Sequence, residues 1–235
     1  MARLLAGTLF LLTVGWVGME VRQWLFRVRA EALLADIKSL ELNRSSWSDA
    51  QRLMFRWGKW GGWYGNCNAD NCTYSIEIYH LRFVYPPFVY DRVPQVGARV
   101  LELVGLRSAA VTARFHVVHG IVTDKGFGVN VALPASQWNA QTYWPSLNVA
   151  FLEGAKAQST PDQFAEHPNR GFIQRRIRLE ASFTPDESPE EKAALTDFHF
   201  DCITRWKACT RRGELLPRAE KEFEAEGRKQ RSPDE

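Results

Sequence analysis

The 235-residue chain lacks the short motifs that identify the commonest enzyme classes. It has no GxSxG elbow of a serine hydrolase, no HExxH helix of a zinc protease, no Walker phosphate loop and no GxGxxG dinucleotide turn. The nearest approach, GFG at Gly126–Gly128, lacks the third glycine and opens a strand rather than a helix. No catalytic residue, metal ligand or cofactor is therefore assigned from a motif, and no cofactor is expected.

The chain also lacks an excess of charge of either sign. Its 30 basic and 27 acidic residues are interspersed, and no basic block alternates with aromatic residues. Because nucleic-acid readers carry a concentrated positive surface or a recognisable module, we expect no nucleic-acid partner. Internal repeats, heptads and low-complexity segments are missing too. The 45% hydrophobic content disfavours disorder, and one packed domain is expected.

Cysteine is scarce and evenly used. The four cysteines form two local pairs, Cys67 with Cys72 and Cys202 with Cys209, and none is left over. This pattern predicts two disulfide bonds, which need an oxidising compartment. A four-thiolate zinc site is the alternative, although only the first pair has a spacing typical of zinc ligands. A cysteine nucleophile is disfavoured because each thiol has a nearby partner.

One long apolar run is present, at the N-terminus. Leu4–Val21 is apolar apart from two threonines and Glu20, and Arg3 precedes it. As a helix, about 18 such residues nearly span the bilayer core. A cleaved signal peptide is the alternative. It needs small residues one and three positions before the cut, and Thr13 with Gly15 fits this poorly and Trp16 with Gly18 worse. We expect residues 1–26 to form a retained transmembrane or signal-anchor helix whose partner is membrane lipid.

Two arguments disagree on which side of the membrane the remaining chain lies. The positive-inside rule compares the cations on the two sides of the apolar run. Four follow the run and one precedes it: Arg22, Arg27, Arg29 and Lys38 against Arg3. Charge thus favours a cytoplasmic domain, whereas disulfides favour a periplasmic or extracellular one, and we follow the cysteines. Two glycosylation patterns, Asn43 in NRS and Asn71 in NCT, add little because so short a pattern recurs by chance.

Helical periodicity continues beyond the apolar run. Apolar residues recur every three or four positions over residues 21–42, which predicts a helix that prolongs the anchor. Residues 27–45 are assigned to this juxtamembrane helix and a linker. Ser46 or Ser48 then caps a second short helix. The glycine-rich WGKWGGWYG at residues 57–65 is expected to be a loop.

Strand-like segments dominate the middle of the chain. They are Thr73–Phe83, Ala110–Val118, Ile121–Leu133, Tyr143–Leu152 and Phe172–Phe183. The second and third are separated only by His119 and Gly120, so they are expected to pair as antiparallel neighbours. Val100–Val104 is ambiguous between helix and strand. The pattern predicts an α+β fold, with a mostly antiparallel sheet and flanking helices in a single domain over residues 46–227.

Helical signals return near the C-terminus. Ser188, Pro189 and Glu191 stand in the order of an N-cap, a first-turn proline and a capping-box glutamate. A last amphipathic helix is expected after Pro217, and residues 228–235 should fray. The predicted sheet is therefore followed by two short helices.

A short alternating segment is the strongest candidate for chemistry. Asp197, His199 and Asp201 alternate with Phe198 and Phe200, so on a strand the three polar side chains share one face. Such a face can hold a divalent metal or a proton-transfer pair. Ordinary strand patterning, with phenylalanines inward and polar groups outward, explains the same alternation, and we prefer it.

Other histidines provide a test of that site. If the segment binds metal, another histidine such as His80 or His116 should converge on it. His116 and His119 make a poor pair by themselves, because side chains three residues apart on a strand point to opposite faces. A turn or surface role is expected for this pair.

An aromatic cluster lies beside the first cysteine pair. Its members are Trp57, Trp60, Trp63 and Tyr64. Aromatic rings on a glycine-rich loop can stack on sugars or rest at a lipid interface, so the cluster is a candidate binding surface. Packing over the core is the structural alternative, and we prefer it.

Together these features predict a membrane-anchored, extracytoplasmic domain that acts as a binding or interaction module. The anchor and the lack of a catalytic constellation motivate this function, and an envelope or membrane protein is the candidate partner. The alternative is a metal-dependent or hydrolytic enzyme that uses Asp197, His199 and Asp201.

Overall fold

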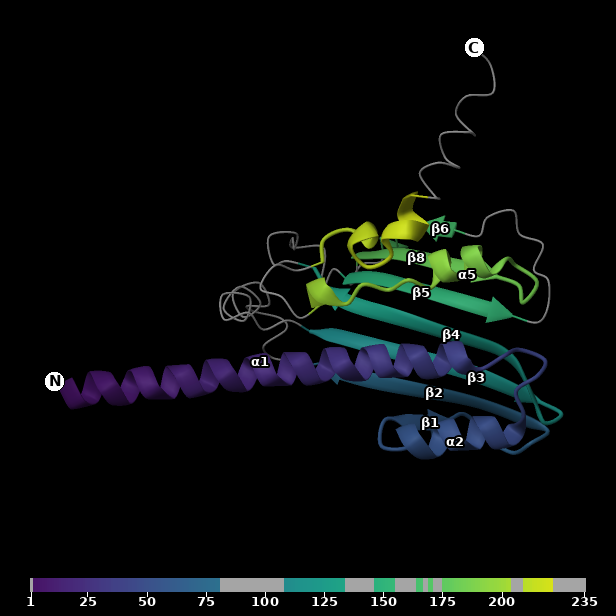
Figure 1. Ribbon diagram of the computed structural model, residues 1–235, viewed down its shortest axis with the longest axis horizontal. Coiled ribbons are helices and arrows are strands. Elements are labelled where there is room, and N and C mark those ends of the chain that lie inside the picture. The colour runs from purple at the N-terminus through teal and green to yellow at the C-terminus, as the bar shows by residue number, and fades with distance from the viewer. Residues whose placement is uncertain are drawn as a thin grey trace, which may run out of the picture.

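The computed structural model describes residues 2–80, 108–133, 146–154, 164–166, 169–170, 175–203 and 209–221. Figure 1 shows a long N-terminal helix that lies along one face of a sheet and projects beyond it. This helix, α1, comprises Ala2–Ser39. At about 1.5 Å per residue it is roughly 57 Å long. The predicted anchor and the predicted juxtamembrane helix are thus one continuous helix.

The described strands form one eight-stranded mixed sheet in the order β1-β2-β3-β4-β5-β8-β6, with β7 also paired to β8. The longer strands are β2 (Asn71–His80), β3 (Ala109–Val118), β4 (Ile121–Ala132), β5 (Ser146–Gly154) and β8 (Arg175–Phe183). The short ones are β1 (Gly61–Trp63), β6 (Phe164–Glu166) and β7 (Asn169–Arg170). The α+β class is confirmed. Within the described sheet, neighbouring strands are antiparallel except for β5 with β8, which are parallel.

Alternating burial shows that the sheet has one covered and one open face. Phe115, Phe127 and Phe151 lie on the covered face and are almost fully buried. Thr112 and Arg114 of β3 point the other way and are exposed. Period-two alternation therefore separates a core face from a polar face, as the sequence predicted.

Local sequence signals fix the ends of several elements. Ser46 and Asp49 form a reciprocal capping box at the start of α2 (Trp47–Trp57). Ser188 and Glu191 form another at α5 (Pro189–Leu195). Each box satisfies backbone N–H groups that a helix start leaves without intrahelical partners. Both helix starts were predicted. A further helix begins at residue 217, and the predicted tail at residues 228–235 lies outside the described residues.

The turn between β3 and β4 confirms the predicted antiparallel pair. His119 and Gly120 both have positive φ, 48° and 80°, a combination that suits a tight hairpin. The register runs from Val118 opposite Ile121 to Ala109 opposite Val131, with one irregularity near His116. His119 thus serves the turn, as predicted.

Two local predictions were wrong. The glycine-rich stretch is not all loop, because Gly61–Trp63 forms β1 at the edge of the sheet, paired with β2. Gly61 permits this pairing, since a Cβ there would lie 2.1 Å from the hydroxyl oxygen of Tyr74. The segment Asp197–Phe200 is not a strand, and Asp201–Ile203 continues it as the 3-10 helix η2. Its ring packing, rather than strand pairing, holds it against the sheet. The predicted Val100–Val104 element lies outside the described residues.

Both predicted disulfides are present. Cys67 is bonded to Cys72, and Cys202 to Cys209. The first closes the loop that leads into β2, and the second joins Cys202, within η2, to Cys209, which precedes the 3-10 helix η3 (Arg212–Glu214). No cysteine of the chain remains free, so the zinc alternative has no thiolates to use.

Candidate functional site

The N-terminal half of α1 is apolar and uncovered. Eight large apolar side chains between Leu9 and Val21 are 48–71% exposed. They are Leu9, Phe10, Leu11, Leu12, Val14, Trp16, Val17 and Val21. Consecutive exposed residues from 9 to 12 cover more than a full turn, so apolar groups surround the helix rather than forming one stripe. Figure 1 shows this half projecting away from the sheet.

The C-terminal half of α1 behaves differently. Phe26, Ala30, Leu33 and Ile37 recur at three and four positions and are at most 3% exposed. This stripe packs on the covered face of the sheet, with contacts to β2, β3 and β4.

Within the described part of the chain, no helix combines the length and hydropathy needed to cross a membrane.

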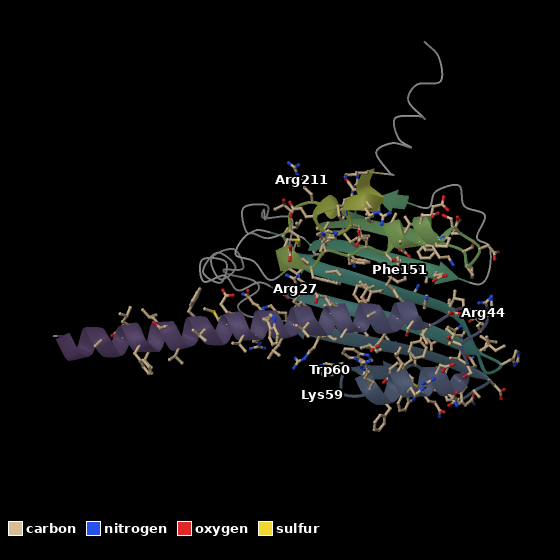
Figure 2. All side chains as sticks on the ribbon, viewed as in Figure 1. Arg27, Arg44, Lys59, Trp60, Phe151 and Arg211 are labelled. Atoms are coloured by element: carbon tan, nitrogen blue, oxygen red, sulfur yellow. A yellow bond between two sulfur atoms is a disulfide. The ribbon has the colours of Figure 1, made fainter. Side chains whose placement is uncertain are left out.

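Cations and tryptophans gather where α1 leaves the domain. The Arg29 guanidinium lies 5.3 Å from the centre of the Trp60 ring, and the Lys59 ammonium lies 5.5 Å from it. Figure 2 shows Lys59 and Trp60 at the end of α2 nearest the projecting half of α1, and Arg44 at the opposite end. Trp24, which belongs to α1, is 61% exposed. Basic and indole side chains of this kind favour a lipid headgroup region.

The link between α1 and α2 is polar and specific. The Trp57 indole N–H donates to Asp36 Oδ2 at 2.8 Å, and Arg56 contacts Asp36 Oδ1 at 2.9 Å. The Trp57 and Trp60 rings are 5.6 Å apart. One carboxylate of the buried half of α1 therefore anchors α2, while Trp60 packs beside Trp57.

The predicted aromatic surface is divided by the fold. Trp57 is buried at 4% exposure and Trp60 is half-buried, so both serve packing. Trp63 and Tyr64 are 61% and 76% exposed, and Trp63 stacks on Tyr74 with ring centres 6.5 Å apart. Only Trp63 and Tyr64 of the four therefore remain available as a binding surface.

The Asp197–Asp201 candidate lies in a hollow beside α1. His199 Nε2 is 3.6 Å from Asp197 Oδ2, and both side chains are about half exposed. Asp201 instead forms an ion pair with Arg27, which also pairs with Glu31 at 2.7 Å. The three predicted residues line one hollow, but the Asp201 carboxylate is paired with Arg27.

His80 and His116, the two histidines expected to converge on this segment, do not line this hollow. His116 is on the open face, where Nδ1 is 3.2 Å from Asp124 and Nε2 is 3.0 Å from Asn71. His80 is buried at 2% exposure against Phe26. Burial, with a contribution from Arg22, lowers the pKa of His80 to about 4. Among the described residues, only Cys202, Cys209 and Glu214 group three metal-type ligands, and the cysteines are disulfide-bonded.

Sequence reasoning missed a buried ionic cluster on the covered face. Lys125 and Glu153 are cross-strand neighbours, 3.2 Å apart and at most 7% exposed, and Lys192 lies 3.1 Å from the other oxygen of Glu153. Lys125 also donates to the carbonyls of Lys38 and Leu40 at the end of α1. Burial lowers the pKa of Lys125, against the opposing effect of Glu153. The sequence signal that could have revealed this cluster is Lys125, which occupies an inward-facing position of a predicted strand.

This cluster has a structural role at the end of α1 and is not a candidate reactive site. The three donor positions of the Lys125 ammonium are taken by two backbone carbonyls and a carboxylate. A cation at the C-terminus of a helix also satisfies its last carbonyl groups. The cluster therefore fixes the end of α1 to β4 and β5.

Comparison with known proteins assigns no family: the chain matches no protein-family model, and no curated protein or solved structure is significantly similar to it. Function is therefore inferred from the chain's own residues. The feature with the clearest functional consequence is the uncovered apolar half of α1, together with the cations and tryptophans at its base.

Proposed function

We propose that this chain is a membrane-tethered domain that faces an oxidising, extracytoplasmic compartment and acts as a binding module. The observation that carries the proposal is the exposed apolar half of α1. Burying a large apolar side chain contributes about 1.5 to 3 kcal/mol. Eight such side chains, each roughly half exposed, leave on the order of 10 kcal/mol to be gained from an apolar environment.

Lipid explains this surface better than a second helix does. Close helix pairing in membranes uses small residues four apart, as in GxxxG, whereas Gly7, Gly15 and Gly18 are spaced eight and three apart. An all-round apolar surface also suits a solvent that contacts every side of the helix. Arg29, Lys59 and the exposed Trp24 at the base suit the headgroup layer that borders it.

The disulfides support the extracytoplasmic side. Two bonds that use every cysteine of the chain are typical of secreted or periplasmic domains and are rare in the cytosol. Trp63 and Tyr64 support the binding role, because exposed aromatic side chains are enriched at protein interfaces. The proposed partner is an envelope or membrane protein that contacts the β1 edge.

Membrane extraction tests the tether. The full chain should remain with membranes in alkaline carbonate and in high salt, because an apolar helix in lipid is not held by screened surface charge. A variant with Leu9, Leu11 and Leu12 changed to serine should be released, whereas Arg29→Gln with Lys59→Gln should not. Release of the unaltered chain by salt alone would refute the tether.

Thiol labelling and crosslinking test the remaining parts. Denatured but unreduced protein should show no reactive cysteine, and four reactive thiols would place the domain in a reducing compartment. A photo-crosslinking residue at Tyr64 should capture a membrane protein, and Trp63→Ser should reduce that capture. A matched crosslinker at exposed Arg52, on the solvent side of α2, should not capture it.

A further inference from the structure

The α1–α2 turn contains one of the two glycosylation patterns, and the structure separates them. Asn43, in Asn43-Arg44-Ser45, is exposed and has a φ of 62°. Its backbone N–H donates to the carbonyl of Val122 at 2.9 Å, which fixes the turn. Among the described residues, no hydrogen bond uses its side-chain amide. The acceptor nitrogen of this pattern therefore faces solvent on a fixed loop.

A hollow of about 530 Å³ opens beside Asn43. Leu42, Phe183 and Pro185 give it apolar lining, and Lys38, Glu41 and Asp186, together with the Lys125–Glu153–Lys192 cluster, give it polar lining. A sugar ring has an apolar face and a rim of hydroxyl groups, so walls of both kinds suit the first sugars of a glycan. The hollow thus supplies a second observation, independent of the sequence pattern.

The other pattern lies in a strand rather than in a turn, although Asn71 is also exposed. Asn71 Oδ1 is 3.0 Å from His116 Nε2, and the Asn71 backbone N–H donates to Asn68 Oδ1 at 3.0 Å. The middle residue, Cys72, is fully buried and disulfide-bonded to Cys67. Closing that short loop fixes the whole Asn71 pattern in the sheet, whereas the Asn43 pattern stays in a turn.

From these observations we infer that Asn43 carries an N-linked glycan, and that Asn71 does not. In the reaction, Asn43 Nδ2 attacks the first sugar carbon of an oligosaccharide carried on a lipid diphosphate. The new bond joins nitrogen to that carbon, the bond from the carbon to the diphosphate oxygen breaks, and the amide nitrogen loses one proton. The inference rests on the proposed extracytoplasmic location, because the transfer occurs in the secretory compartment.

The position of Asn43 favours this assignment. The α1–α2 turn lies at the far end of the covered part of α1 from the projecting apolar half, as the position of Arg44 in Figure 2 shows. A glycan there lies at the end of the domain away from the projecting apolar half of α1. It would also add solubility to the end of the domain that the tether leaves free.

The test is expression of the full chain in eukaryotic cells, with gel mobility measured before and after an endoglycosidase that removes N-linked glycans. Asn43→Asp keeps a residue that tolerates positive φ but removes the acceptor nitrogen, and Asn71→Asp is the matched control. The parent and Asn71→Asp should carry one removable glycan, and Asn43→Asp should carry none. A glycan that persists in Asn43→Asp, or a parent without glycan, overturns the inference.

Thiol labelling of the same samples distinguishes a failure of the inference about Asn43 from a failure of the proposed extracytoplasmic location. If the parent lacks a glycan while all four cysteines are oxidised, the location stands and only the inference about Asn43 fails. If the parent lacks a glycan and its cysteines are reduced, the proposed extracytoplasmic location fails, and the inference fails with it.

Discussion

The two halves of α1 belong to one continuous helix, yet they meet different surroundings. Over residues 23–39 one stripe of side chains is buried on the sheet, and exposed residues such as Arg29 and Lys38 alternate with it. Over residues 6–18 every described side chain is exposed, although almost all are apolar. Helix formation is therefore common to both halves, and the distribution of polar residues decides what each half packs against.

The C-terminal segment that packs beside the buried half offers the largest contrast between neighbouring side chains. Phe198 lies 5.1 Å from Phe127 and 6.3 Å from Phe151, ring centre to ring centre, and is 8% exposed. Phe198→Ala should destabilise the domain by about 3 to 5 kcal/mol in urea unfolding, through lost burial and a cavity. His199→Ala, half exposed, should stay within about 0.5 kcal/mol.

Adding a divalent metal tests whether His199 is instead a metal ligand. A melting temperature that rises with added divalent metal in the parent, but not in His199→Ala, would revive the enzyme alternative. With the present geometry we expect no such rise, because Asp201 is engaged with Arg27.

A matched pair of substitutions tests the two halves of α1 directly. Ile37 is fully buried, whereas Leu11 is 71% exposed. Ile37→Ala should lower the free energy of unfolding, measured in detergent micelles, by about 2 to 5 kcal/mol. Leu11→Ala should change it by less than about 0.5 kcal/mol. Similar losses at both positions would show that the apolar half also packs on the domain.

His80 gives a smaller, pH-dependent effect at the junction of the halves. Its folded pKa of about 4 lies below the ordinary value of 6.5, so the unfolded chain binds the proton more readily. Stability from this group is complete above about pH 6.5 and declines as the pH falls towards 4. By about pH 5 the parent should lose about 2 kcal/mol relative to about pH 7.5, and His80→Leu should lose correspondingly less. Equal pH dependence in both proteins would contradict a buried, neutral His80.

Much of the fold could be predicted from local sequence signals. The Ser46 and Ser188 caps, the hairpin at His119 and the alternation of the long strands each depend on neighbouring residues, and each was predicted. The parallel pairing of β5 with β8 and the edge strand β1 depend on contacts between distant segments, which local periodicity does not encode.

The candidate sites were harder to predict for the same reason. Alternation correctly placed Phe198 and Phe200 inward, but the strand expected from it did not form. The Arg27 partner of Asp201 comes from 174 residues away in the chain. The Lys125–Glu153–Lys192 cluster likewise joins two strands and a helix. Such pairs become visible only when the topology is known.

Hydrogen exchange of α1 in phospholipid vesicles tests the central claim most directly. Peptides from residues 6–22 and 23–39 would be compared by mass spectrometry in the full chain reconstituted in vesicles. A chain without the apolar half, in detergent-free solution, is the control for the domain alone. Lipid excludes water from the apolar half, so both peptides should exchange slowly in vesicles, and the 23–39 peptide should be equally protected in the control. Rapid exchange over residues 6–22 in vesicles, beside a protected 23–39, would show that the apolar half lies in water and would contradict the membrane tether.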